Sequence, residues 1–157
     1  MGDAVISERL LQGVAVVTGA TQGLGKALAL ELAGLGVTVA AIGRDEAGLR
    51  RVAAEAPGGR VHPVVLDVGE IGAVPQAFAG IARDLGPVTL LINNAAVYPR
   101  RDFLEEDPQD FMATVAINLG GVVACSHAAL MEMVETGFGR ILNVSTFADV
   151  LPVPASA

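Results

Sequence analysis

The feature of this sequence that most constrains its fold is an alternation of short apolar runs with amphipathic helical runs across residues 14–145. Five runs rich in β-branched residues predict strands at 14–18, 37–42, 61–66, 88–93 and 141–145. Most of these runs are nearly continuous in apolar residues, which is typical of strands covered on both faces. Because strand and helix alternate, we expect right-handed βαβ crossovers and predict an α/β fold with a doubly wound parallel sheet.

The helical runs carry their own signals. Apolar residues recur at steps of three and four within 49–56 and within 71–85, as on the buried face of a helix. A glycine follows three of the helical runs, where a left-handed residue is needed to end a helix: Gly36, Gly86 and Gly137.

The longest helical run begins after Asp107, whose carboxylate can cap it, with Pro108 suited to the first helical position. It continues through residue 136 and contains two adjacent glycines, Gly120 and Gly121. Each glycine costs a helix about 1 kcal/mol relative to alanine. The pair therefore predicts a kink or a close neighbour at this point of the helix.

Length and composition fit one domain, 1–157, with an ordinary packed core, since 52% of the 157 residues are hydrophobic and 17% are charged. The net charge of −7 argues against binding to nucleic acid. The single cysteine, Cys125, lies in an apolar helical run, where a buried thiol in a reducing compartment is expected. No apolar run approaches the length of a membrane span and no signal-peptide pattern stands at the N-terminus, so we expect a cytoplasmic protein that binds no membrane.

A glycine-rich turn between the first strand and the next helix carries the first chemical signal. Glycines let such a turn take positive φ and let a diphosphate approach the backbone, while the helix N-terminus offers free N–H groups and partial positive charge. In the first βα unit of a doubly wound sheet, this is the place of a dinucleotide site. The same pattern would also suit a tight turn that binds no ligand.

The spacing Thr-Gly-x-x-x-Gly-x-Gly, from Thr18 to Gly25, resembles the short-chain dehydrogenase/reductase family, and the resemblance extends over residues 14–157. A second block, 93–96, reads Asn-Asn-Ala-Ala where the family has Asn-Asn-Ala-Gly beside the cofactor. Asp67, followed by valine, matches a residue that contacts the adenine ring. Asn118 matches the helix asparagine whose backbone carbonyl holds a water of the proton relay.

The resemblance implies a Rossmann-type sheet of about five strands in the order 3-2-1-4-5, with a nicotinamide dinucleotide as partner. It also implies which residues contact the cofactor: Gly19, Thr21, Gln22, Gly23, Leu24, Gly25, Arg44, Asp67, Val68, Asn94, Ala95 and Ala96.

The end of the second strand bears on the choice of cofactor. Family members that prefer NAD place an acidic residue there for the ribose hydroxyls, whereas here Gly43 holds that place and Arg44 follows it. A guanidinium suits a 2′-phosphate through a bidentate, charge-assisted contact. We therefore expect NADP to be preferred, with NAD possible. Arg44 could instead be a solvated arginine that opens the next helix.

In the family, the fifth strand delivers a catalytic serine, and about a dozen residues later a Tyr-x-x-x-Lys motif opens the next helix. Here Ser145 or Thr146 would supply the hydroxyl, and the tyrosine would fall just past Ala157. The only tyrosine is Tyr98, with no lysine four residues on, and the only lysine is Lys26. Because the motif supplies the proton donor, we predict a chain that is truncated relative to the family and inactive by itself.

No metal site is predicted, because His62 and His127 have no second histidine or cysteine at ligand spacing. Three methionines of the long helix are expected to serve packing: Met112, Met131 and Met133. In the family, this helix pairs with its copy in a neighbouring subunit. The resemblance therefore implies a homo-oligomer formed through the long helix, 107–136.

Two functional hypotheses follow. In the first, the chain is part of an NADP-preferring oxidoreductase that transfers a hydride between its cofactor and a small carbonyl compound or secondary alcohol. In the second, it is a non-catalytic dinucleotide-binding or interaction module. We favour the first, because a domain selected to work alone should not leave its fifth strand as an exposed apolar edge.

Overall fold

The structure is a computed structural model that describes residues 8–99, 102 and 104–146. Strands and helices alternate along it as predicted. The strands are β1 (Val14–Thr18), β2 (Thr38–Gly43), β3 (Val61–Val65), β4 (Val88–Asn93) and β5 (Arg140–Asn143). The α-helices are α1 (Glu8–Leu11), α2 (Gly23–Gly34), α3 (Glu46–Glu55), α4 (Val74–Leu85), α5 (Pro108–Val115) and α6 (Gly121–Thr136). Three shorter turns of helix complete the set: η1 (Pro57–Gly59), η2 (Ile71–Ala73) and η3 (Ala116–Gly120).

The five strands form one parallel sheet in the order β3-β2-β1-β4-β5. β1 lies at the centre, where Val16 stands opposite Ala40 of β2 on one side and Leu91 of β4 on the other. The predicted α/β class, the parallel pairing and the strand order are confirmed. Consecutive strands β3 and β4 lie on opposite sides of β1, so the sheet has a topological switch point beside β1, where α/β proteins bind ligands.

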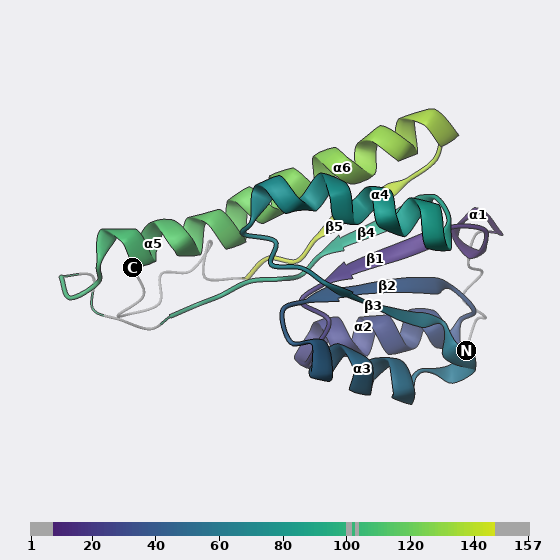
Figure 1. The fold of residues 1–157 in the computed structure, drawn as a ribbon, viewed down its shortest axis with the longest axis horizontal. Coiled ribbons are helices and arrows are strands. Elements are labelled where there is room, and N and C mark those ends of the chain that lie inside the picture. The colour runs from purple at the N-terminus through teal and green to yellow at the C-terminus, as the bar shows by residue number, and fades with distance from the viewer. Residues whose placement is uncertain (1–7, 100–101, 103, 147–157) are drawn as a thin grey trace.

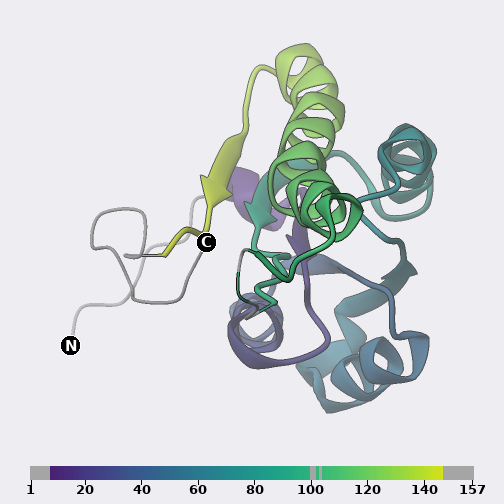
Figure 2. The ribbon, with the colours of Figure 1, turned by 90° about the vertical axis from the view of Figure 1, so that its left-hand side faces the viewer.

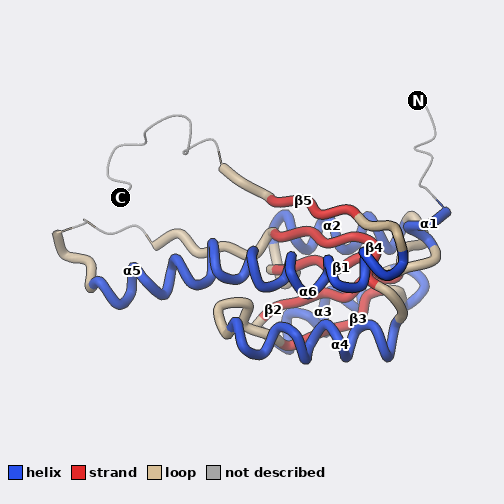
Figure 3. Tube along the Cα trace, turned by 90° about the horizontal axis from the view of Figure 1, so that it is seen from above, coloured by secondary structure: helices blue, strands red, loops and turns tan. Residues whose placement is uncertain are grey.

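Helices cover both faces of the sheet, with α4 and α6 on one face and α2 and α3 on the other (Figure 1, Figure 3). Alternate residues of β1 point into the two layers: Val14 and Val16 pack with Phe78 of α4, and Ala15 and Val17 pack in the cluster that contains Leu49 of α3. The central strands are buried on both faces for this reason, which explains their continuous apolar runs.

The two edge strands are less covered than their sequences suggest. Among the described residues, β5 pairs with β4 alone and is largely exposed, with Leu142 exposed to 49%. Val65, at the end of β3, is exposed to 55%. Figure 2 shows β5 at the outer edge of the sheet. Cover on both faces, expected for most of the strands, is present in β1, β2 and β4 but not in β3, and the expectation of an exposed apolar fifth strand is confirmed.

The long helical run is interrupted where the glycine pair predicted it would be. Asp107 caps α5 by accepting a hydrogen bond from the N–H of Gln109, and η3 is a turn of π-helix that ends at Gly120. A Cβ at Gly121 would lie 2.8 Å from Cγ2 of Val68, and a Cβ at Gly120 would meet Ile71. The helix thus has both a distorted turn and close neighbours at the two glycines.

The run Pro108–Thr136 is 29 residues long, and its most apolar window has a mean hydropathy of 1.5. By length and composition alone it would qualify as a membrane span, contrary to the expectation that no apolar run approaches that length. Cys125, Ala129 and Met133 on α6 are nevertheless buried against the sheet, as in a helix that covers a protein core. The packing role predicted for the methionines holds for Met133 only, because Met112 and Met131 are each exposed to 60%.

The three glycines that follow helices have positive φ; Gly137 is in the left-handed region as predicted, whereas Gly86, with a ψ of 178°, is not. Gly36, Gly86 and Gly137 follow helices α2, α4 and α6 with φ values of 91°, 115° and 66°. These turns bring the chain back to the amino edge of the sheet, so that the loops at the opposite, carboxyl edge are left to build a site.

Candidate dinucleotide site

A pocket of about 330 Å³ lies at the carboxyl edge of the sheet, around the ends of β1, β2, β3 and β4. All twelve residues for which the family resemblance implied cofactor contacts line it: Gly19, Thr21, Gln22, Gly23, Leu24, Gly25, Arg44, Asp67, Val68, Asn94, Ala95 and Ala96. The fold therefore brings together residues that are scattered over four loops. Their role as ligand contacts remains a prediction.

Five further residues line the same pocket and were not among the predicted contacts: Ile42, Gly43, Leu66, Val97 and Ile117. Four of them belong to strand ends or to the loops that follow them. These four could have been predicted from the sequence, because the last residues of adjacent parallel strands meet at one edge of the sheet. The contact of Ile117 with the pocket could not be predicted in this way, since Ile117 lies in the distorted turn η3 rather than at a strand end.

The glycine-rich turn has the geometry that its sequence requires. Gly19 and Gly23 have φ values of 66° and 55°, in the left-handed region that favours glycine. A Cβ at Gly25 would collide with the carbonyl oxygen of Gly19 and lie 2.5 Å from Nδ2 of Asn94. The first turn of α2 therefore packs directly against the end of β1.

Asn94 ties this turn to the loop after β4. Its side-chain Nδ2 donates hydrogen bonds to the carbonyl oxygens of Thr18 (2.9 Å) and Gly19 (3.3 Å). In return, Oγ1 of Thr18 accepts hydrogen bonds from the backbone N–H groups of Asn94 and Ala95, each at 2.9 Å. Thr18 is thus a buried positioning residue, a role that its place at the start of the glycine motif does not reveal.

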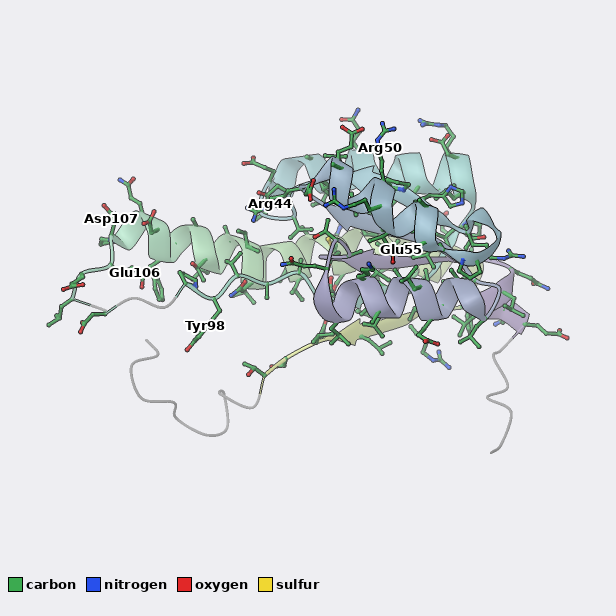
Figure 4. All side chains as sticks on the ribbon, turned by 90° about the horizontal axis from the view of Figure 1, so that it is seen from below. Arg44, Arg50, Glu55, Tyr98, Glu106 and Asp107 are labelled. Atoms are coloured by element: carbon green, nitrogen blue, oxygen red, sulfur yellow. The ribbon has the colours of Figure 1, made fainter. Side chains whose placement is uncertain are left out.

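The charged end of the pocket is formed by Arg44 and Asp67. Nη1 of Arg44 lies 3.5 Å from Oδ2 of Asp67, and Oδ1 of Asp67 accepts a hydrogen bond of 2.9 Å from the N–H of Gly69. Arg44 precedes α3 and is largely exposed, but it also lines the pocket. Figure 4 shows it on the side of the sheet's carboxyl edge.

Gly43 holds the position at which an acidic residue would favour NAD. A Cβ there would lie 2.9 Å from Cγ2 of Thr21, whose side chain also packs close to Gly48. An aspartate or glutamate at position 43 would therefore require Thr21 to move. The glycine turn therefore packs closely against the end of β2 at this position.

Asn118 lies in η3 and does not line the pocket. Its side chain is joined to the backbone of Val97, which does: Oδ1 accepts a hydrogen bond from the N–H of Val97 (2.9 Å), and Nδ2 donates one to its carbonyl oxygen (2.8 Å). The predicted distortion of the helix at Asn118 is present. Its predicted part in a proton relay remains a prediction.

Ser145 and Thr146 follow β5 and are exposed, outside the lining of the pocket. The strand before them is fixed by Asn93, whose Nδ2 donates to Oδ1 of Asn143 (2.8 Å) and to Oγ of Ser126 (3.0 Å). The carbonyl oxygen of Asn93 also accepts a hydrogen bond from the N–H of Val144 (2.9 Å). The end of β5 is therefore held in place at the carboxyl edge, just before Ser145 and Thr146. Which of these two hydroxyls would contact a substrate stays open.

The single tyrosine and the single lysine lie apart from one another. Lys26, on α2, forms an ion pair of 2.8 Å with Glu55 of α3, and Tyr98, on the loop after β4, is exposed to 57% (Figure 4). Cys125 is fully buried, and burial raises the pKa of its thiol to about 11. Within the described residues, no three histidine, cysteine or acidic side chains gather as metal ligands.

Comparisons with known proteins agree with this geometry. The family model described as short chain dehydrogenase matches residues 13–157. Short-chain reductase protein NovJ of Streptomyces niveus is 35% identical over 139 residues, and gluconate 5-dehydrogenase of Gluconobacter oxydans is 35% identical over 148 residues. The matches cover 87% and 91% of this chain but 53% and 57% of those proteins, so the chain spans about half the length of these relatives.

Among solved structures, a metagenomic short-chain oxidoreductase in complex with NADP superposes with a TM-score of 0.89 and 33% sequence identity. The match covers 94% of this chain and 68% of that one. The described fold is therefore shared over nearly its whole extent with an oxidoreductase crystallised with its dinucleotide.

Proposed function

The chain belongs to the short-chain dehydrogenase family, and from that membership we propose that it is a dinucleotide-binding domain that takes NADP in preference to NAD. The observation that carries the proposal is the pocket at the carboxyl edge of the sheet, where the glycine turn, Arg44 and Asn94 meet. A diphosphate would lie over the glycine turn and the N-terminus of α2, where backbone N–H groups and the helix dipole favour negative charge.

Two features of the pocket support the preference for NADP. Arg44 places a guanidinium at the end of β2, suited to a 2′-phosphate. Gly43 offers no carboxylate to ribose hydroxyls, and a side chain at this position would require Thr21 to move. The structural relative that was solved with NADP is consistent with the same choice.

We further propose that the whole protein is an oxidoreductase acting on a small carbonyl compound or secondary alcohol. When bound, the nicotinamide would supply the hydride chemistry. In this chain, a hydroxyl of Ser145 or Thr146 would hydrogen-bond the substrate oxygen, and the backbone carbonyl of Asn118 would hold a water. Residues 1–157 contain no Tyr-x-x-x-Lys motif to provide the proton donor. The proposal is therefore that this chain alone binds the cofactor but does not turn over substrate.

Titration of the 157-residue chain with NADPH and with NADH tests the binding proposal. We expect saturable binding of both, tighter for NADPH. At a free concentration about 100 times its Kd, NADPH should stabilise the fold by about 2.7 kcal/mol, which corresponds to a rise in Tm of about 5–10 °C. No saturable binding of either dinucleotide would refute the proposal.

Reductase assays with NADPH and a panel of aldehydes and ketones test the second part. We expect no turnover above background from the chain alone, and turnover only when a second polypeptide supplies the tyrosine and lysine. Turnover by the chain alone would show that another group donates the proton. Binding of dinucleotide with no turnover under any complementation would favour the alternative function, a non-catalytic binding module.

Assembly and location are proposals of the same kind. An apolar stripe on the outer side of α6 consists of Val123, Leu130, Met131 and Val134, which are exposed to between 51% and 72%. We propose that this stripe lies in a contact between two copies of the chain, because four exposed large apolar side chains gather on one helix, and such clusters often mark protein–protein contacts. We also propose a cytoplasmic location, which cell fractionation would test.

A further inference from the structure

We propose that Asp67 is a specificity-determining residue, because its carboxylate competes with the 2′-phosphate of NADP for the guanidinium of Arg44. The inference rests on the proposed function, since it concerns the same pocket. It assigns to Asp67 an effect on the choice between two cofactors, which is separate from any contact with an adenine ring.

The two side chains are brought together by the sheet. Gly43, the last residue of β2, stands opposite Val65 of β3, and its carbonyl oxygen accepts a hydrogen bond of 3.0 Å from the N–H of Leu66. Arg44 therefore follows the end of β2, and Asp67 lies just beyond the end of β3, on neighbouring paired strands. Their side chains meet across the charged end of the pocket, with Nη1 of Arg44 at 3.5 Å from Oδ2 of Asp67.

The two partners differ in how firmly they are held. Oδ1 of Asp67 accepts a hydrogen bond from the N–H of Gly69, and the Asp67 side chain is exposed to only 33%. Gly69 is itself confined, since a Cβ there would lie 2.9 Å from Cγ1 of Ile117. The side chain of Arg44 is exposed to 64%, and among the described residues its one charged partner is Asp67. Asp67 is thus the fixed partner and Arg44 the movable one.

The contact between Arg44 and Asp67 affects the charge that a bound phosphate would meet in the pocket. Of the described residues that line it, Arg44 alone carries a positive charge and Asp67 alone a negative one, so the lining is neutral in sum. The two carboxylates that follow Arg44 in the chain contact other arginines: Asp45 lies 3.5 Å from Arg51, and Glu46 pairs with Arg50. A 2′-phosphate entering the pocket would therefore meet one guanidinium whose charge is already partly balanced by Asp67.

The expected change in cofactor preference is small, because the ion pair between Arg44 and Asp67 is long. A separation of 3.5 Å exceeds the roughly 2.7–2.9 Å of a charge-assisted hydrogen bond, and exposed pairs of this kind contribute little. Removal of the Asp67 charge should therefore strengthen binding of NADP relative to NAD by about two- to fivefold.

The experiment measures Kd for NADP⁺ and for NAD⁺ on the full chain and on Asp67→Asn, Arg44→Gln and the double variant. The quantity of interest is the ratio of the two Kd values, because any loss of an adenine contact weakens both cofactors alike and cancels. Glu46→Gln serves as the matched control, since it removes the same charge nearby from a residue paired with Arg50. Thermal melts of each variant establish that the fold is retained.

We expect Asp67→Asn to shift the ratio toward NADP by about two- to fivefold, Glu46→Gln to shift it clearly less, and Asp67→Asn to have no effect on the ratio in the Arg44→Gln background. An unchanged ratio, or a shift toward NAD, would overturn the inference, as would an effect that persists without Arg44. If the unchanged chain bound neither dinucleotide, the proposed function itself would fail. Binding with an unaltered ratio would refute only the role of Asp67.

Discussion

The replacement of Gly25 by alanine tests the proposed construction of the glycine turn most directly. The new Cβ would collide with the carbonyl oxygen of Gly19 and lie 2.5 Å from Nδ2 of Asn94. Backbone cannot yield as a flexible side chain would, so α2 has to move away from the end of β1. Overpacking of this kind costs about 1–3 kcal/mol.

The displacement should also weaken the hydrogen bonds of Asn94 to the carbonyl oxygens of Thr18 and Gly19, each worth about 1 kcal/mol. The total loss for Gly25→Ala is then about 2–4 kcal/mol, and for a chain of this length we expect Tm to fall by about 5–15 °C. Binding of NADPH should weaken as well, because the same groups line the pocket.

Two further glycines of α2 separate the cost of a steric clash from the cost of an unfavourable backbone conformation. Gly34, the last residue of α2, has no atom of another described residue within 4 Å of the place that a Cβ would occupy, so Gly34→Ala should stabilise the chain by up to about 1 kcal/mol. Gly23 also has free space, but its φ of 55° should make Gly23→Ala cost about 1–2 kcal/mol through the backbone alone. The assays are thermal unfolding and NADPH titration of all three variants. If Gly25→Ala melted like the unchanged chain and bound NADPH equally well, the account of the turn as a close-packed corner would be wrong.

Three other predictions concern separate parts of the molecule. Asn118→Ala removes both hydrogen bonds to Val97 and should lower the free energy of unfolding by about 1–3 kcal/mol and weaken NADPH binding, measured by denaturant melts and titration; an unaffected affinity would show that the Val97 loop does not shape the pocket. Val123→Glu should lower the mass measured by light scattering to that of a monomer if α6 joins two copies, whereas an unchanged mass would exclude this face. Burial raises the pKa of Cys125 to about 11, so the native thiol should resist thiol reagents at about pH 8 and react only on unfolding. Because the thiol of the unfolded chain ionises at about pH 8.5, the free energy of unfolding should stay level below that pH and fall as the pH rises toward 11. Rapid labelling of the native chain by a thiol reagent would contradict the burial of Cys125.

The central strands could be predicted closely from sequence because burial on both faces leaves a continuous apolar run. β1 and β4 have the predicted bounds, 14–18 and 88–93. β5 does not: it covers 140–143 rather than 141–145. The reason is its single neighbour, since the hydrogen-bonded ladder stops where β4 ends, with Asn93 opposite Asn143. Beyond that point the N–H of Val144 still donates to the carbonyl oxygen of Asn93, but the paired register with β4 ends at Asn143, whatever the β propensity of the residues that follow.

The loops of the pocket could be predicted as a set, but not the contacts between them. Glycine spacing indicated the first corner, and strand ends indicated where the others would meet it. The pairing of Arg44 with Asp67 could not be read from sequence, because it depends on the register of Gly43 with Val65. The same holds for Asn118, whose amide meets Val97 only because η3 carries it past the loop after β4.

The structure separates the part that binds from the part that would react. The glycine turn and Asn94 are anchored to β1 and β4, so the pocket rests on the two strands of the sheet that are buried at every residue. Ser145 and Thr146 depend on a four-residue edge strand and on the amide of Asn93. Asn93→Ala should therefore cost about 1–3 kcal/mol and loosen β5 while NADPH still binds, whereas Gly25→Ala should impair binding and leave the β4–β5 pairing intact. Amide hydrogen exchange of Leu142 and Val144, measured beside NADPH titration, distinguishes the two. If Asn93→Ala abolished binding to the same degree as Gly25→Ala, the pocket and the hydroxyl-bearing edge would have to be one cooperative unit rather than two.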